Sequence, residues 1–316
     1  MGTGNPIALE QFARLADKRL DEVMEGILKP YSEQIFSIFG SMPLDKAWAE
    51  VYGIGGTPDI PEFGGKLEFL DIAPTYYTRC EPKEYAGGLQ FQKRFIEDKQ
   101  YSVLDDKQSR MLEAYGRTKE KSAVKAFAYG YTTSWDFMSN EENLSLFNSS
   151  HTTKSGVSTA SGFSNISTLP LTKTNLAATW IMTQMFRDDI GEFFEADYDT
   201  IIVPLALYDT ALEVTGYDPR TGATSELDPE SARHKINVNY KRFKVIPWKR
   251  LDLYSTKSWF MIDSTLAKKF LKWIDRVKPE TATDHDFHTF AIMQSLRGRF
   301  GWFWSDWRFG FMNQVS

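Results

Sequence analysis

The sequence predicts an α+β fold, and three stretches carry that prediction. Residues 66–93 alternate apolar with polar side chains, which is typical of half-buried strands. Residues 98–130 repeat apolar side chains at helical spacing and predict one helix about 45 Å long, at about 1.5 Å per residue. Residues 290–311 are rich in aromatic side chains and predict a long strand or a pair of strands.

The first 97 residues favour elements that reach outward from a body. Residues 8–28 have an amphipathic helical pattern, which we expect Pro30 to end. Residues 52–65 hold five glycines and two prolines and predict an extended segment. In 66–93, two strand signals flank a polar middle and predict a protruding hairpin. Such a ribbon is marginally stable alone, so we expect it to lean on something, for instance another subunit.

The middle of the chain predicts a rod followed by a loop. Asp98 or Ser102 is a suitable N-cap for the long helix, and Gly116 inside it indicates a bend or a close approach. Residues 146–170 are rich in serine, threonine and glycine, and we interpret them as a crossing between ordered parts. His151 stands beside two serines there, but the sequence has no G-x-S-x-G nucleophile motif, so we expect no catalysis.

Beyond residue 170 the pattern predicts a mixed body. We expect a helix over 172–192 with Thr174 as N-cap, and a buried strand that turns at Pro204 into a short helix ending at Gly216. A polar insert covers 218–235. Strand-like segments follow, and then a helix over 264–277 capped by Ser264.

Composition excludes several classes of protein. The net charge is −5, whereas a free-standing nucleic-acid binder normally carries a basic surplus. The single cysteine allows no intramolecular disulfide and fits a reducing compartment. We find neither a signal peptide nor a stretch of about 20 apolar residues, so we expect a soluble protein. The many aromatic residues hint at association, and we interpret Trp302, Trp304 and Trp307 as core or subunit packing.

The most metal-like stretch is Asp284-His285-Asp286-Phe287-His288. Its spacing matches no established zinc motif, and we interpret it as a solvated acidic loop. A metal-dependent hydrolase using His285, Asp286 and His288 is the enzyme alternative, and chelator sensitivity would identify it. We expect no catalytic residue, no cofactor and no bound metal.

Four segments together resemble a known family. They are FQKRFIEDKQYSVLDDKQSRMLEAYGRTKEKSAVKAFAYGY (91–131), LFNSSHTTKSG (146–156), LTKTNLAATWIMTQMFRDDIGE with DTIIVPLALYDTALEVTG (within 171–216), and FGWFWSDWRFGF (300–311). Their order resembles the major capsid proteins of tailed bacteriophages, particularly the Mu-like group, which have the Hong Kong 97 phage fold. The resemblance spans roughly residues 60–316 and is weakest between 217 and 260.

The resemblance implies a division of the chain into five parts. These are an N-terminal arm (1–65), an extended E-loop ribbon (66–97), a peripheral domain with the spine helix (98–170), a mainly axial domain (171–277), and return strands of the peripheral domain (278–316). Because only about sixty residues precede the ribbon, we expect a separate scaffolding protein or a mature, truncated form.

By the same resemblance, the function is structural. The chain would assemble with itself into hexamers and pentamers of an icosahedral phage head around double-stranded DNA, without sequence-specific DNA contacts and with no membrane. A scaffolding protein and a portal would be its partners, and assembly would take place in the host bacterial cytoplasm. An encapsulin-like shell enclosing protein cargo is the alternative. The implied subunit-contact residues are Phe69, Tyr76, Tyr77, Lys83, Tyr85, Lys93, Arg94 and Asp98.

Overall fold

The computed structural model divides the chain into two compact units. It describes residues 24, 26–65, 67, 69–70, 72–92, 98, 101–216, 239, 242–286, 288 and 291–315. Unit 1 comprises Met1–Trp48, Glu81–Ala123 and Trp273–Trp302, and unit 2 comprises Ala49–Cys80, Val124–Lys272 and Phe303–Ser316. Among the described residues, no helix combines the length and the apolar character that crossing a membrane requires.

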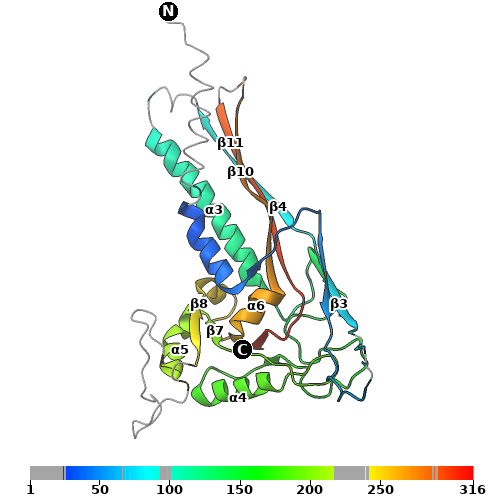
Figure 1. Cartoon of the computed structure of the whole chain (residues 1–316). Helices are drawn as coiled ribbons and strands as arrows, with labels where there is room; N and C mark the ends of the chain where they lie inside the picture. The colour runs from blue at the N-terminus through cyan, green and yellow to red at the C-terminus, as the bar shows by residue number, and fades with distance from the viewer. Residues whose placement is uncertain are drawn as a thin grey trace, which may run out of the picture. The chain divides into compact units, whose positions relative to one another are not determined.

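Unit 1 joins a long helix to a sheet. The sheet has the strand order β1 (Gly40–Ser41), β10 (Leu271–Asp286), β11 (Ala291–Trp304) and β4 (Lys83–Gln92). Strands β11 and β4 are antiparallel, with Ala291 opposite Gln92 and Phe300 opposite Lys83. The helix α3 (Tyr101–Ala128) runs along these strands and ends in unit 2 (Figure 1). The predicted long helix is thereby confirmed.

Aromatic rings fill the core of unit 1. Trp273 of β10 stacks on Phe300 of β11 with ring centroids 5.4 Å apart, and Phe39 meets Trp273 edge-on at 5.9 Å. Lys119 of α3 is buried against them, and its Nζ lies 2.9 Å from an Asp275 carboxylate oxygen. This ion pair and the rings join α3 to the sheet.

The close approach predicted at Gly116 is confirmed. A Cβ atom there would come within 2.4 Å of the ring of Tyr31. Tyr31 belongs to a helix that covers residues 26–38 and runs through Pro30. Gly116 therefore lets this helix pack against α3.

Unit 2 is built on a mixed five-stranded sheet. Its order is β6 (Ile166–Ser167), β12 (Gly310–Asn313), β9 (Trp259–Ile262), β7 (Thr200–Val203) and β8 (Lys244–Pro247). The pairs β12–β6 and β7–β8 are parallel, whereas β9 is antiparallel to both β12 and β7. All four residues of β7, β9 and β12 are buried, so the centre of this sheet is core on both faces.

Among the described residues, three α-helices and two short 3-10 helices complete this part of unit 2. They are α4 (Lys173–Gln184), η1 (Leu205–Leu207), α5 (Tyr208–Thr215), η2 (Lys249–Leu253) and α6 (Ser264–Phe270). Helix α5 ends as predicted at Gly216, which has a φ of 64° in the left-handed region that glycine tolerates. The predicted insert 218–235 lies outside the described residues.

A second sheet of unit 2 consists of β2 (Ala49–Ile54), β3 (Pro74–Cys80) and β5 (Met138–Asn140), with β3 in the middle. Strands β2 and β3 are antiparallel and form a hairpin whose long connection covers residues 55–73. The ladder shifts register between Tyr52 and Ile54, and a Cβ on the intervening Gly53 would collide with the side chain of Thr75. A residue without a side chain suits this irregularity.

The predicted ribbon at 66–93 is wrong in its pairing. Strand β3 pairs with β2 and β5, whereas β4 pairs with β11, so the two halves of the predicted ribbon belong to different sheets. The KLEFL signal is not a strand in its described residues. An alternating pattern indicates which face of a strand is buried, but it does not indicate which strand lies beside it. The hairpin that the structure contains spans residues 49–80.

Two helix boundaries also differ from the prediction. Pro30 does not end the first helix, because burial of Ile35 and Ile38, at about 1.5–3 kcal/mol each, offsets the roughly 3 kcal/mol that an interior proline costs. Residues 8–23 of that prediction lie outside the described part. Thr172 rather than Thr174 caps α4.

The predicted helix over 264–277 is half strand. Asp263, not Ser264, is the N-cap of α6, and its carboxylate accepts the N–H groups of Thr265 and Leu266. The chain turns extended at Leu271 and continues as β10. Trp273 and Ile274 are fully buried in that strand, so sheet packing outweighs their local helical pattern.

Candidate functional site

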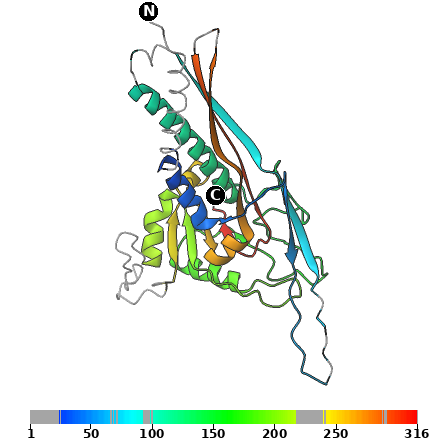
Figure 2. The same ribbon diagram turned by 45° about the horizontal axis from the view of Figure 1, so that its top comes forward.

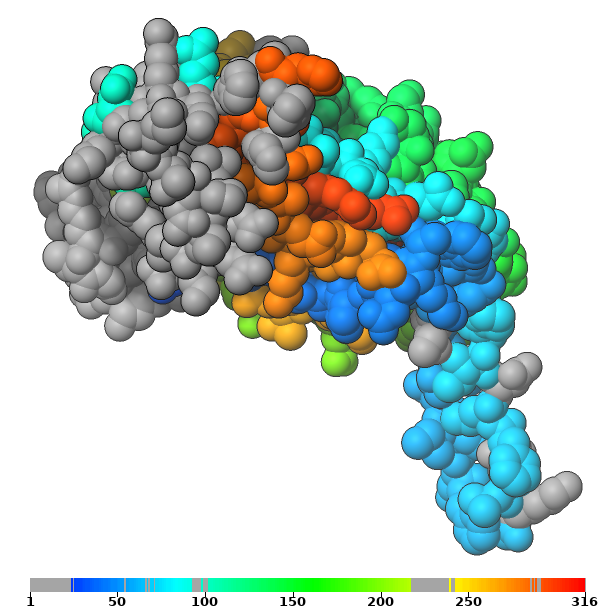
Figure 3. All heavy atoms as spheres, turned by 90° about the horizontal axis from the view of Figure 1, so that it is seen from above, coloured from blue at the N-terminus to red at the C-terminus, as the bar shows by residue number. Residues whose placement is uncertain are grey.

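The loop between β2 and β3 exposes a row of large apolar side chains. Phe69 is 97% exposed and Ile60 is 88% exposed, and the other members of the row are Phe63, Leu67, Leu70 and Ile72. Figure 2 shows this hairpin standing away from the rest of unit 2, and Figure 3 shows the same projection in space-filling form. A contiguous exposed apolar segment of this kind marks an interaction surface.

Hydrogen bonds and one cation hold the base of the hairpin. The backbone N–H of Tyr77 and the Nζ of Lys154 both donate to Glu141, at 3.1 and 2.5 Å. The hydrogen bond from Lys154 lowers the pKa of the Glu141 carboxyl most, and the hydrogen bond from the Tyr77 N–H lowers it further. The hydroxyls of Tyr76 and Thr152 lie 2.9 Å apart. The polar segment after β5 therefore fastens β3.

That polar segment is an ordered, partly buried structure and not merely a crossing. His151 is fully buried, and its ring stacks on Trp307 with centroids 4.2 Å apart. Its Nδ1 lies 3.1 Å from a Glu142 carboxylate oxygen, and its Nε2 lies 3.2 Å from the side-chain oxygen of Asn165. These contacts tie the hairpin base to the segment before β12.

Asn165 is the centre of this polar cluster. Its side-chain oxygen accepts the backbone N–H of Asn148 at 2.8 Å, and its Nδ2 donates to the carbonyl oxygens of Leu146 and Gly310 at 2.9 and 3.2 Å. Because backbone groups meet both ends of the amide, its orientation is determined. Asn165 has no exposed surface, and without its side chain these backbone groups would each lose a hydrogen-bond partner.

We predict that Asn165→Ala lowers the free energy of unfolding by about 3 kcal/mol, because several buried backbone groups lose their partners. Urea unfolding followed by circular dichroism measures this change. Asn175→Ala is the matched control, since the Nδ2 of Asn175 donates to the carbonyl of Pro170 at an exposed site, and we expect a loss under about 1 kcal/mol. Equal losses in the two variants would contradict the role of Asn165.

Arg308 forms a second buried cluster beside Trp307. Its guanidinium donates to Asp306 and Asp189 at 3.1 and 3.0 Å and to the carbonyl of Arg187 at 2.7 Å. Burial opposes its charge, but Asp306 and Asp189 outweigh burial and raise the pKa of Arg308. Burial raises the pKa of Asp189, and Arg308 acts against this rise. The guanidinium also lies 4.8 Å from the centre of the Trp307 ring.

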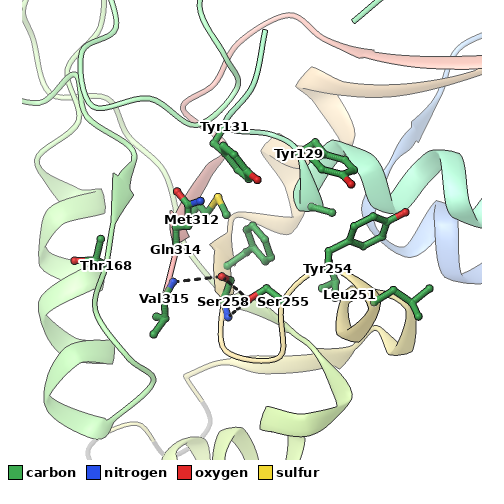
Figure 4. A pocket seen from close by; sticks show the side chains of 13 residues that line it. Tyr129, Tyr131, Thr168, Leu251, Tyr254, Ser255, Ser258, Met312, Gln314 and Val315 are labelled. Atoms are coloured by element: carbon green, nitrogen blue, oxygen red, sulfur yellow. Dashed lines mark hydrogen bonds between the residues drawn. The ribbon is translucent and has the colours of Figure 1, made fainter. Parts of the chain in front are cut away.

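A cavity of about 540 Å³ opens elsewhere in unit 2, where the end of α3, η2 and the last strand meet (Figure 4). Tyr129 and Tyr254 meet edge-on with centroids 5.1 Å apart, and Tyr131 lines another wall. Burial raises the pKa of Tyr254, Tyr129 adds to the rise and Arg250 opposes it. The cavity is therefore aromatic inside and has a cation nearby.

The sequence-predicted contact residues do not form one site. Phe69 lies in the exposed loop and Tyr76 and Tyr77 at the base of the hairpin in unit 2, whereas Lys83 and Tyr85 lie on β4 in unit 1. Tyr85 stacks on Phe300 at 4.3 Å, so much of its ring is used within its own unit. Asp98 is exposed, and Lys93 and Arg94 lie outside the described residues.

The structure lends no support to the metal alternative. Within the described part of the chain, no three histidine, cysteine or acidic residues come together as a metal site would require. The Asp286 side chain accepts the backbone N–H of His288 at 2.9 Å, and the His285 side chain lies outside the description. The three tryptophans 302, 304 and 307 are buried, which confirms that they pack.

The buried clusters around Asn165 and Arg308 escaped sequence reasoning. The sequence neighbours of His151 are Ser150 and Thr152, whereas its partners in the fold are Glu142, Asn165 and Trp307. The family resemblance contains a signal for both clusters, the segment Asp306-Trp307-Arg308. Trp307 stacks on His151 in the cluster around Asn165, and Asp306 accepts hydrogen bonds from Arg308 in the other cluster.

A family model described as phage capsid protein matches residues 76–313, which is most of the chain. The chain belongs to this phage capsid protein family. This capsid protein is a structural, non-enzymatic protein of the virion capsid. Neither the encapsulin-like alternative nor the hydrolase is favoured, and the Mu-like group stays a prediction.

Solved capsid structures share the fold of this capsid protein. The cyanophage Pam1 capsid is 12% identical with a TM-score of 0.52, over 86% of this chain and 87% of that chain. The capsid of Myoviridae phage XM1 is 11% identical with a TM-score of 0.50, over 89% and 91%, and that of a native GTA particle is 11% identical with a TM-score of 0.50, over 88% of both. They confirm the predicted α+β, Hong Kong 97-like fold. No curated protein matches the chain.

Proposed function

We propose that this capsid protein forms hexamers and pentamers that close an icosahedral head around double-stranded DNA, and that the β2–β3 hairpin joins neighbouring copies. The observation that carries the proposal is the row of exposed apolar side chains on residues 55–73. In a shell every copy has neighbours, so a surface left uncovered in one chain is covered by the next.

The hairpin takes the role of the E-loop in place of the predicted ribbon 66–97. It projects from unit 2, it carries Phe69, and its base holds Tyr76 and Tyr77 (Figure 2). Each large apolar side chain contributes about 1.5–3 kcal/mol when it moves from water into a contact. A neighbouring copy that covers several of them thus gains enough to hold two subunits together.

The remaining assignments follow the same scheme. We assign α3 and its sheet to the peripheral domain and the five-stranded sheet with α4 and α5 to the axial domain. The predicted ranges 98–170, 171–277 and 278–316 then keep these roles only in their main parts, because β6 and β12 belong to the axial sheet and β10 belongs to the peripheral sheet from Leu271 on. Residues 1–48 then belong to the arm. The net charge of −5 suits a shell that encloses DNA without sequence-specific contacts. A scaffolding protein and a portal would act during assembly in the host bacterial cytoplasm.

We expect the purified full chain to form rings, tubes or closed particles. Size-exclusion chromatography with light scattering measures the mass, and negative-stain microscopy shows the form. A chelator should change neither, since no metal takes part. Particles recovered from infected or expressing cells should contain nuclease-protected double-stranded DNA rather than protein cargo. A chain that stays monomeric under crowding, at varied salt and with its scaffold would contradict the proposal.

A further inference from the structure

The cavity beside the end of α3 combines an uncharged aromatic interior with a basic border. Its lining includes Tyr129, Tyr131 and Tyr254 together with Leu253, and among the described residues no charged side chain lines it. Leu253 is 69% exposed, so the cavity opens to the surface of unit 2. Such an interior fits an apolar or aromatic side chain from outside.

Basic residues flank the lining residues along the chain. Lys249 and Arg250 precede Leu251 at the start of η2, and Lys257 lies between Ser255 and Ser258. Lys249 and Lys257 are exposed. Asp252, the acidic residue of η2, accepts the backbone N–H groups of Leu205 and Ala206 and is directed to them. An apolar occupant with acidic neighbours would complement this border.

The hairpin loop has the complementary composition. Phe63 and Phe69 are exposed aromatic side chains, and Asp59 and Glu62 are exposed acids in the same loop. Over residues 55–73 the sequence has four acidic residues and one lysine, which gives a net charge of 1 − 4 = −3. The loop thus offers aromatic side chains with acids between them.

The loop of the same chain lies away from the cavity. Figures 1 and 2 both show the β2–β3 hairpin at one side of unit 2 and β8, which is followed directly by η2, at the other. The loop of another copy can reach the cavity, because its position is not fixed by this chain. A contact in which one patch of a copy binds a different patch of the next copy links the copies in series.

We propose that the cavity lined by Tyr129, Tyr131, Leu253 and Tyr254 receives the aromatic side chains of the β2–β3 loop of a neighbouring copy. Phe69 or Phe63 enters the cavity, and Asp59 and Glu62 face Lys249 and Lys257 at its border. This inference rests on the proposed role of the hairpin as a contact between copies and names the surface that it meets.

Crosslinking between two singly substituted chains tests the contact. We expect Phe69→Cys and Leu253→Cys chains, mixed during assembly, to give a covalent dimer with a short bismaleimide. The native Cys80 is fully buried and serves as the background in unsubstituted chains. The matched control pairs Phe69→Cys with Ile181→Cys, because Ile181 is an exposed apolar residue of α4 (58% exposed) and offers another surface in unit 2.

Each outcome distinguishes the inference from the proposal on which it rests. A dimer with Leu253→Cys and none with Ile181→Cys supports the cavity. A dimer with Ile181→Cys alone overturns the cavity and leaves the hairpin as a contact between copies. Particles without either crosslink overturn the inference, and particles that also form without the loop overturn the role of the hairpin.

Charge reversal gives a second readout that needs no cysteine at Phe69. We expect Glu62→Lys and Lys249→Glu each to lower particle yield at least tenfold at low ionic strength, and the double variant to return it to within about threefold of wild type. Added salt should narrow these differences because it screens charges at the surface. If the two losses of particle yield add up in the double variant, Glu62 and Lys249 do not face each other.

Discussion

Replacing residues 57–72 with a short glycine-serine linker should leave a folded chain that forms no particles. The loop contributes exposed apolar side chains, whose removal from an isolated chain loses no core contact. In an assembly, burial of six large apolar side chains amounts to roughly 10 kcal/mol before the entropy of association is subtracted. Since 1.4 kcal/mol is about a tenfold change in affinity, we expect the concentration needed for assembly to rise more than about 100-fold.

Circular dichroism and thermal unfolding check the fold of the variant, and light scattering with microscopy checks its assembly. The control keeps the loop and changes Ile60→Val, Phe63→Leu and Phe69→Leu, which preserves its apolar character. We expect the control to assemble with wild-type morphology. Wild-type particle yield from the linker variant would refute the role of the hairpin.

Arg308→Met should be the most destabilising single substitution among those considered for unit 2. The guanidinium is buried between Asp189 and Asp306, and methionine leaves both carboxylates without their cation. Removing one partner of a buried ion pair costs about 3–5 kcal/mol. Urea unfolding at pH 7 measures the loss. Arg110→Met is the control, because Arg110 and Asp106 are exposed on α3 and such pairs contribute under about 0.5 kcal/mol.

The loss in Arg308→Met should shrink as the pH falls. Burial already raises the pKa of Asp189 in the folded chain, and without Arg308 it rises further. A carboxyl with a higher pKa in the folded state binds protons preferentially when folded, so it destabilises the fold at high pH and is relieved as pH falls through that pKa. We therefore expect a smaller loss at pH 5 than at pH 8. An equal loss at both would mean that Asp189 is not the group left uncompensated.

The spacing and composition of neighbouring residues correctly predicted the elements that such residues specify. The helix α3 follows from apolar spacing over 28 residues, and α5 ends at a glycine that can adopt positive φ. The long aromatic strands near the C-terminus likewise follow from their composition. In each case the residues that specify the structure lie within one or two turns, or one strand, of each other.

Strand partners and buried polar clusters required the tertiary structure. The sequence determined by itself a negatively charged α+β chain with one long helix and a resemblance to phage capsid proteins. Only the tertiary structure decided that β3 pairs with β2, that residues 271–277 extend a sheet, and that His151 meets Asn165. Those contacts join residues far apart in the chain, and their free energy comes from burial and pairing that no local periodicity records.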